Sequence, residues 1–407
     1  MAKNQRRKLK SKLICSGFTK LLDGPFKWDI KSIDLFEGFP VLPFVSWTMN
    51  TDRLNSFCRN ILDPWEQIVW IGNDDLIPLL EFFRTESLFV NQSQVFRFCP
   101  SSHQEYLLRI RQTCDPSRTV YVVLGRTLDE FDLIKLVMAL NREKKVFVGP
   151  AIGVMSEYAR FLMIPFYPIE TNSYRFWLHS ELFYLPLNAM ELSIENLIQG
   201  CDEGFSTLAD LASATAHMVY NMQLKGIQSI YFIADSYPVF SLLKALRPLI
   251  EESGNGSSNC LKTKILTIES LKENYLEQVL SSDKRDLFFI LNQTASGHRL
   301  ETPITLPDIL RENSYLGKEL SVLDNQSFSR YNQANIDALQ YQIKKNGSSF
   351  INLQYPESDL FSLGLITAFF YYFSCFSSWL RGYDVLNDPP YAEFDRLIWR
   401  FLKQPVE

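Results

Sequence analysis

The sequence predicts an α/β protein made of two doubly wound parallel-sheet domains and a helical C-terminal region. Short apolar runs alternate with segments of helical spacing along most of the chain. A largely helical stretch, residues 193–226, interrupts this alternation, which then starts again. Alternating strands and helices are typical of a parallel sheet with helices on both faces. A chain of 407 residues is also long enough for two or three globular units.

The first round of the pattern begins with EQIVWIG, a short apolar run that ends in glycine. Apolar residues at helical spacing follow it, so the two segments together predict a strand, a turn and a helix. The same order recurs farther along the chain. We expect a strand at 66–72, a helix at 76–84, a strand and a helix within 119–140, a strand at 144–149, a helix at 156–163 and a strand at 164–169.

The second round repeats this order, with strands expected at 228–234, 263–268 and 286–291 and a helix at 238–253. Breaks are expected near residue 200 and in the polar loop GNGSSN, residues 254–259. The predicted organisation is an N-terminal extension over 1–54, a first domain over 55–200, and a second domain over 201–407 that includes the C-terminal helices.

One uncharged stretch, Leu360 to Leu380, has the 21 residues needed to span a bilayer. It also contains four serines, a threonine and two tyrosines, and no second stretch of this kind occurs in the sequence. A buried core helix is therefore favoured over a membrane span.

Composition excludes several classes of function. The 41 Lys and Arg residues against 46 Asp and Glu residues give a net charge of -5, which provides no general attraction to nucleic acid or to an anionic membrane. Six of the first twelve residues are basic, but no apolar signal region follows them. The seven cysteines are scattered and form no CxxC pair, which argues against disulfides and zinc and favours a reducing cytoplasm.

Three turns are candidates for ligand binding, because ligands of open parallel sheets bind beyond the carboxyl ends of the strands. They read GNDD (72–75), LGRT (124–127) and ADSY (234–237), and each precedes an expected helix. A helix start favours anions, and Arg126 and Thr127 add a charge and a hydroxyl. Plain capped turns remain the alternative. Nucleotide-binding, serine-hydrolase and metalloprotease motifs are absent from the sequence.

Four segments, in order along the chain, resemble the glucose-6-phosphate isomerase family. DPWEQIVWIGNDDLIPLL is similar to its first strand and glycine turn, and residues 156–205 are similar to the region of its glycine-glycine-arginine signature. YFIADSYPVFSLLKALRPLIEESGNG resembles the strand and helix that carry the family's Glu-Ser, and YDVLNDPPYAEFDRL resembles its C-terminal stretch.

The resemblance implies two sugar-isomerase (SIS) domains, a cytoplasmic homodimer, and interconversion of glucose 6-phosphate and fructose 6-phosphate without a metal or other cofactor. Such a reaction needs a carboxylate that moves a proton between carbons 2 and 1, and a cation that stabilises the enediolate. It also needs a group that opens the sugar ring, and donors that hold the phosphate.

The resemblance assigns these roles to particular residues. Glu252 matches the catalytic base and Arg175 matches the signature arginine; the alternatives are a solvated helix end and a surface or ion-paired arginine. Glu269 aligns near the ring-opening histidine, and Asp395 aligns with a C-terminal lysine. The implied phosphate-binding residues are Gly72, Asn73, Gly125, Arg126 and Thr127.

Several positions depart from the family pattern. Ser173 and Tyr174 replace the two signature glycines, and Trp177 replaces a serine. A carboxylate at Asp74 would repel phosphate unless it were paired or turned away. Three hypotheses stay open: a divergent sugar-phosphate isomerase, a catalytically impaired relative that binds a sugar phosphate or a protein partner, and a dimeric interaction protein whose cleft is filled by Tyr174 and Trp177.

Overall fold

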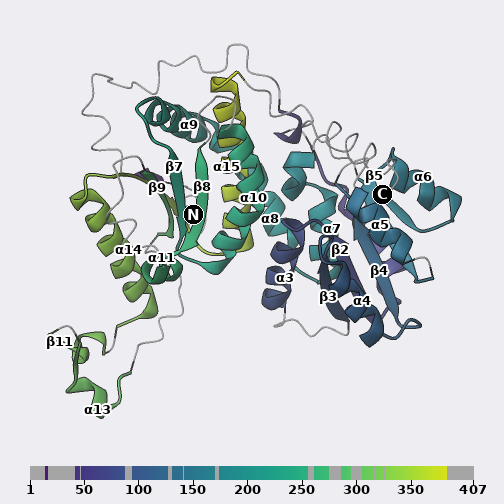
Figure 1. Ribbon diagram of the computed structural model, residues 1–407, viewed down its shortest axis with the longest axis horizontal. Helices are drawn as coiled ribbons and strands as arrows, with labels where there is room; N and C mark the ends of the chain where they lie inside the picture. Colours follow the sequence, from purple (N-terminus) through teal and green to yellow (C-terminus); the bar gives the residue numbers. More distant parts are fainter. Residues whose placement is uncertain are drawn as a thin grey trace, which may run out of the picture.

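The computed structural model describes residues 14–16, 42–45, 47–87, 94–126, 131–140, 142–169, 174–254, 261–274, 286–294, 305–315, 317–324 and 326–382. These residues form two five-stranded sheets, each flanked by helices (Figure 1). The α/β class with two parallel-sheet domains is therefore confirmed.

The first sheet has the strand order β3-β2-β4-β5-β6, and all of its strands are parallel. All six residues of β4 are buried, because alternate side chains enter the two cores on opposite faces of the sheet. This explains the uninterrupted apolar runs in the sequence. The elements are β2 (Gln67–Gly72), α3 (Leu76–Ser87), β3 (Val95–Pro100), α4 (Gln104–Thr113), β4 (Thr119–Leu124), α5 (Phe131–Ala139), β5 (Lys145–Pro150), α6 (Val154–Phe161) and β6 (Phe166–Ile169).

The second sheet has the order β1-β12-β9-β7-β8, in which only β1 runs antiparallel to its neighbour. Its central strands β7 and β9 also bury side chains on both faces. The elements are β1 (Ile14–Ser16), β7 (Ser229–Ala234), α10 (Tyr237–Gly254), β8 (Lys262–Thr267), α11 (Ile268–Asn274), β9 (Asp286–Gln293), α14 (Phe328–Lys345), β12 (Ser349–Tyr355) and α15 (Leu360–Leu380).

A helical segment connects the two sheets, as the sequence predicts for residues 193–226. It contains η5 (Tyr174–His179), α7 (Glu181–Ala189), α8 (Ile194–Thr207) and α9 (Ala209–Leu224). The predicted division at residue 200 falls inside α8, and the domain boundaries remain a prediction. Before the first sheet lie η3 (Pro43–Val45), α2 (Thr51–Phe57) and the π-helical η4 (Cys58–Leu62).

A small excursion precedes α14 and projects from the second sheet at the lower left of Figure 1. It consists of α13 (Asp308–Arg311), the paired short strands β10 (Ser314–Tyr315) and β11 (Lys318–Glu319), and η6 (Leu320–Leu323).

The apolar helix α15 lies in the core, where it packs against α8, α9 and α10. Every residue from Ser362 to Ser378 is buried, and among the described helices this is the one long and apolar enough to cross a membrane. The burial favours the predicted core helix. Two glycines permit very close contact with α8: a Cβ atom added at Gly364 would lie 2.3 Å from the Leu197 carbonyl oxygen, and one added at Gly200 would lie 2.0 Å from that of Phe361.

Candidate active site

The first sheet changes strand order between β2 and β4, which are adjacent although β3 lies between them in the sequence. Open α/β sheets bind ligands at such a switch point, beyond the carboxyl ends of the strands. Two of the predicted turns, GNDD after β2 and the start of LGRT after β4, lie at this edge. The strand order of the sheet therefore brings these two turns together.

Backbone hydrogen bonds hold these turns in place. The Asn73 carbonyl accepts the N–H groups of Leu76 and Ile77 and so begins α3. The Gly125 N–H donates to the Val148 carbonyl at 2.8 Å, which ties the end of β4 to β5. A Cβ atom added at Gly149 would lie 3.2 Å from the Gly125 carbonyl oxygen, so this edge has little spare room.

Arg126, a predicted phosphate ligand, forms an ion pair with a residue of the other turn. Its Nη1 atom lies 2.6 Å from Asp75 Oδ2, and the two side chains are 17% and 15% exposed. The guanidinium also lies over the Trp177 ring, 5.8 Å from the ring centroid. Asp74 is exposed, and its Oδ1 atom accepts the Ser102 N–H at 3.3 Å. The carboxylate at the switch point is thus that of Asp75, which the sequence analysis did not single out.

Arg175 and Glu252, the predicted electrostatic partner and base, are in direct contact. The Arg175 Nε atom lies 2.5 Å from Glu252 Oε2, although the two residues are 77 positions apart. The Arg175 side chain is 2% exposed and that of Glu252 is 26% exposed. Arg175 belongs to η5, which follows β6 of the first sheet, whereas Glu252 is in the last turn of α10 beside the second sheet. The ion pair therefore joins the two halves of the molecule.

Helix α10 sets the orientation of Glu252. Leu249 and Ile250 are buried on its inner face, and Glu251 pairs with Arg247 one turn earlier at the surface. Glu252 is directed toward Arg175 and Glu251 toward Arg247, although the two side chains are similarly exposed, at 26% and 30%. At the opposite end of the helix, the Tyr237 ring contacts Phe82 of α3, with centroids 5.4 Å apart. Helix α10 thus contacts the first domain at both of its ends.

Trp177 does not fill a cleft. Its side chain is 2% exposed, belongs to the main core, and meets the Phe183 ring edge-on at 5.8 Å. The cleft-filling hypothesis requires both Tyr174 and Trp177 in the cleft, and this placement excludes Trp177 from it. The side chain of Tyr174, the other residue of that hypothesis, lies outside the described residues.

His179, at the end of the same 3-10 helix, is buried behind the site. Its Nδ1 atom is 2.7 Å from the Tyr184 hydroxyl, and its ring meets those of Trp47 and Phe205 edge-on. Burial lowers the pKa of His179 to about 4, so the ring is neutral at physiological pH. A neutral histidine packed among aromatic rings serves as a structural residue.

The remaining predicted residues are not brought to the Arg175–Glu252 pair. Glu269 is exposed in α11, which follows the carboxyl end of β8, whereas Glu252 precedes the amino end of β8. Strand β8 spans about 20 Å, and Glu252 and Glu269 lie at its opposite ends. Thr127 and Asp395 lie outside the described residues. Gly72 is buried, and its carbonyl accepts the Ser101 N–H at 2.7 Å.

The third predicted turn, ADSY, lies at the carboxyl edge of the second sheet and is closed by its own side chains. Asp235 accepts the Gln293 N–H at 2.7 Å and the Tyr355 hydroxyl through its other oxygen. The Ser236 hydroxyl is 3.0 Å from the Tyr355 hydroxyl and accepts that of Ser358 at 2.9 Å. This edge therefore resembles a capped turn more than an open anion site.

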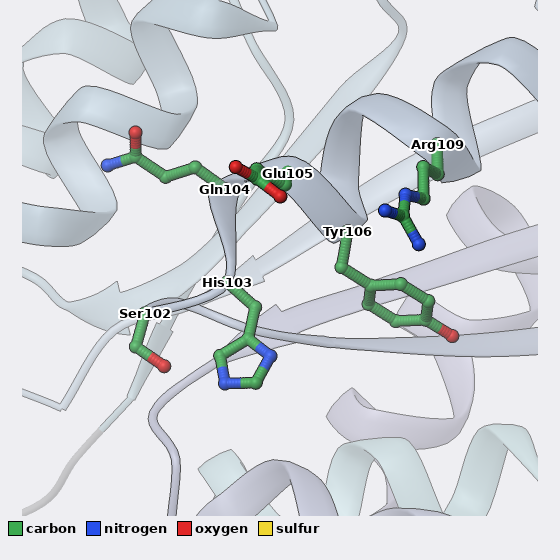
Figure 2. Close-up of a pocket in the computed structure, with 6 residues that line it drawn as sticks. All are labelled: Ser102, His103, Gln104, Glu105, Tyr106 and Arg109. Atoms are coloured by element: carbon green, nitrogen blue, oxygen red, sulfur yellow. The ribbon is translucent and has the colours of Figure 1, made fainter.

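A pocket of about 520 Å³ opens at the start of α4. Figure 2 shows Ser102 and His103 on the segment that leads into the helix, with Tyr106 and Arg109 on the turns that follow. None of the predicted site residues lines it. Within the described part of the chain, no group of three or more His, Cys, Asp or Glu side chains is arranged to hold a metal ion.

Comparison with solved structures supports the fold. The chain superimposes on a hypothetical protein from Thermus thermophilus with a TM-score of 0.77 and 16% identity, covering 97% of this chain and 100% of that one. A glucose-6-phosphate isomerase from Chlamydia trachomatis matches with a TM-score of 0.64 and 15% identity, over 86% of this chain and 72% of that one. A tagatose-6-phosphate ketose/aldose isomerase from Escherichia coli matches with a TM-score of 0.52 and 9% identity, over 83% and 89% of the two chains.

At the level of sequence, no family profile matches the chain, and no curated protein does either. The structural neighbours, which include a putative phosphosugar isomerase from Bacillus subtilis, share the fold of SIS-domain phosphosugar isomerases. The chain has this two-domain SIS-type fold.

Proposed function

We propose that the chain is an aldose-ketose isomerase of sugar phosphates whose reaction centre is the Arg175–Glu252 pair. Glucose 6-phosphate and fructose 6-phosphate are the first substrates to test, because the resemblance implies them. The supporting observation is that the two residues assigned to proton transfer and charge stabilisation, 77 positions apart, lie 2.5 Å from each other.

The chemistry assigned to the pair is a proton transfer between neighbouring carbons. The Glu252 carboxylate takes the proton from carbon 2, and the electrons of that C–H bond form the double bond of an enediolate. The proton of the carbon-2 hydroxyl moves to oxygen 1, and Glu252 returns its proton to carbon 1 while the carbonyl forms at carbon 2. A buried guanidinium beside the reacting oxygens stabilises the negative charge of the enediolate, since burial weakens solvent screening. Arg175, 2% exposed, meets that requirement.

A catalytically impaired relative that binds a sugar phosphate or a protein is the second candidate. One observation favours it: Arg126, the cation expected to hold the phosphate, is already paired with Asp75. The exposed position of Glu269 on α11 adds to this, because no other described residue has been assigned to ring opening. The homodimer and the cytoplasmic location implied by the resemblance remain predictions.

A coupled assay of fructose 6-phosphate conversion to glucose 6-phosphate tests the proposal. We expect Glu252→Gln to reduce kcat by about 10²-fold to 10⁴-fold, the usual contribution of a positioned acid or base. Glu251→Gln is the matched control, because this neighbouring carboxylate is paired with Arg247. The kcat of this variant should stay within twofold of that of the unmutated protein.

Two outcomes would contradict the isomerase proposal. One is an equal loss of activity in the Glu251→Gln and Glu252→Gln variants. The other is an inactive unmutated protein whose circular dichroism spectrum shows an intact fold. The second outcome would favour the binding protein, which titration with fructose 6-phosphate in a calorimeter would then detect.

A further inference from the structure

The switch point of the first sheet has an unusual charge balance for the phosphate end of a sugar-phosphate site. Its cation, Arg126, and its carboxylate, Asp75, approach to 2.6 Å with their side chains 17% and 15% exposed. A pair this far from solvent is screened less than a surface pair, so each charge largely cancels the other. A phosphate that arrives at this edge meets little net positive charge.

The Asp75 carboxylate also keeps an unused acceptor. Its Oδ1 atom is buried and has no hydrogen-bond partner among the described residues, while Oδ2 accepts from Arg126. Asp75 immediately precedes α3, whose N-terminal end carries a partial positive charge. The carboxylate therefore lies where an anionic ligand would otherwise be stabilised, both by the helix and by the arginine.

We propose that Asp75 is a specificity-determining residue that competes with the phosphate of the substrate for Arg126. To bind, the phosphate must displace the tethered carboxylate or lie next to it, and like charges at such short range are costly. The site consequently binds a phosphate dianion more weakly than it would without the Asp75 charge. This inference rests on the proposed use of the β2–β4 edge as the phosphate end of the site.

The geometry around Arg126 explains why removal of the Asp75 charge should create a phosphate site rather than a disordered arginine. The guanidinium lies over the Trp177 ring, which is itself held in the core. The attraction between the guanidinium and this ring remains when Asp75 is neutralised, so we expect Arg126 to keep its orientation. Asp75→Asn retains the size of the side chain and removes the charge alone.

Isothermal titration calorimetry with inorganic phosphate, on the full chain, measures the effect. We expect Asp75→Asn to bind phosphate about tenfold or more tightly than the unmutated protein, since a like charge beside the ligand has been removed. The double variant Asp75→Asn with Arg126→Gln should lose this gain. Asp74→Asn is the matched control, because that neighbouring carboxylate is exposed and accepts the Ser102 N–H. This substitution should change the phosphate affinity less than twofold.

Equal or weaker phosphate binding by a folded Asp75→Asn protein would overturn the inference and assign Asp75 the role of orienting Arg126. If Asp75→Asn fails to fold, Asp75→Ser is measured instead against the same criterion. Tighter phosphate binding without isomerase activity in any variant would refute the proposed reaction and leave this inference standing. Isomerase activity that depends on Glu252, without any gain in phosphate affinity in Asp75→Asn, would support the proposed reaction and overturn this inference.

Discussion

The contact between Arg175 and Glu252 predicts a measurable coupling in stability between the two halves of the molecule. Two unit charges about 4 Å apart attract by about 4 kcal/mol at the effective dielectric constant that applies to most protein sites. The Glu252 side chain keeps 26% of its exposure, so water screens part of this attraction. We expect a coupling free energy of about 2 kcal/mol between the two side chains.

A double-mutant cycle measures this coupling. The free energy of unfolding in urea is determined for the unmutated protein, Arg175→Met, Glu252→Gln and the double variant, with each transition fitted separately if the domains unfold in steps. The Arg247–Glu251 pair supplies a control cycle on the same helix, because its side chains are 52% and 30% exposed. That i,i+4 surface pair should couple by only about 0.3–0.5 kcal/mol.

A coupling of less than about 0.5 kcal/mol between Arg175 and Glu252 would refute this reasoning. It would mean that the ion pair is not held in the ligand-free protein, and that the link between η5 and α10 depends on apolar packing alone.

Two further predictions concern the core. Gly364→Ala should lower the free energy of unfolding by about 2–3 kcal/mol, because the new Cβ would lie 2.3 Å from the Leu197 carbonyl oxygen and α15 would have to move away from α8. Gly254→Ala, where the Cβ would be 3.6 Å from its nearest neighbour, is the helical control, and an equal loss in both variants would disprove the clash. His179 has a folded pKa of about 4, below its unfolded value near 6.5, so its contribution to stability is fully present above pH 6.5 and is lost as the pH falls toward 4. Between pH 7 and pH 5 the unmutated protein should lose about 2 kcal/mol more stability than His179→Phe, as urea unfolding at the two pH values would show, and parallel losses would contradict the assigned burial.

Local patterns in the sequence were sufficient for most of the parallel strands. Runs such as IVWIG and VYVVL are apolar throughout because strands in the middle of a covered parallel sheet are buried on both faces. The helices that follow them have one apolar side, so the change in spacing marks the end of each strand. Both patterns depend only on residues close together along the chain, so a single sequence is sufficient to recognise them.

Other elements escaped the sequence analysis because polar side chains break their pattern. Strand β3 includes Arg97, and β12 includes the partly or fully buried amides of Asn352 and Gln354. Strand β1 is only three residues long and is defined by its antiparallel pairing with β12. Such strands are recognised by their neighbours in the sheet, and those neighbours are distant in the sequence.

The candidate site divides in the same way. The sequence alone determined which turns end the strands of the first sheet, and through the resemblance it selected Arg175 and Glu252 as reacting groups. Only the tertiary structure decided which charges meet: Arg175 with Glu252 across 77 positions, and Arg126 with Asp75 across 51. Strand order brings Arg126 to Asp75, and the packing of α10 against the first half of the molecule brings Glu252 to Arg175. The Coulomb attraction between two side chains depends on their separation in space and on their exposure to water, neither of which is expressed in local sequence.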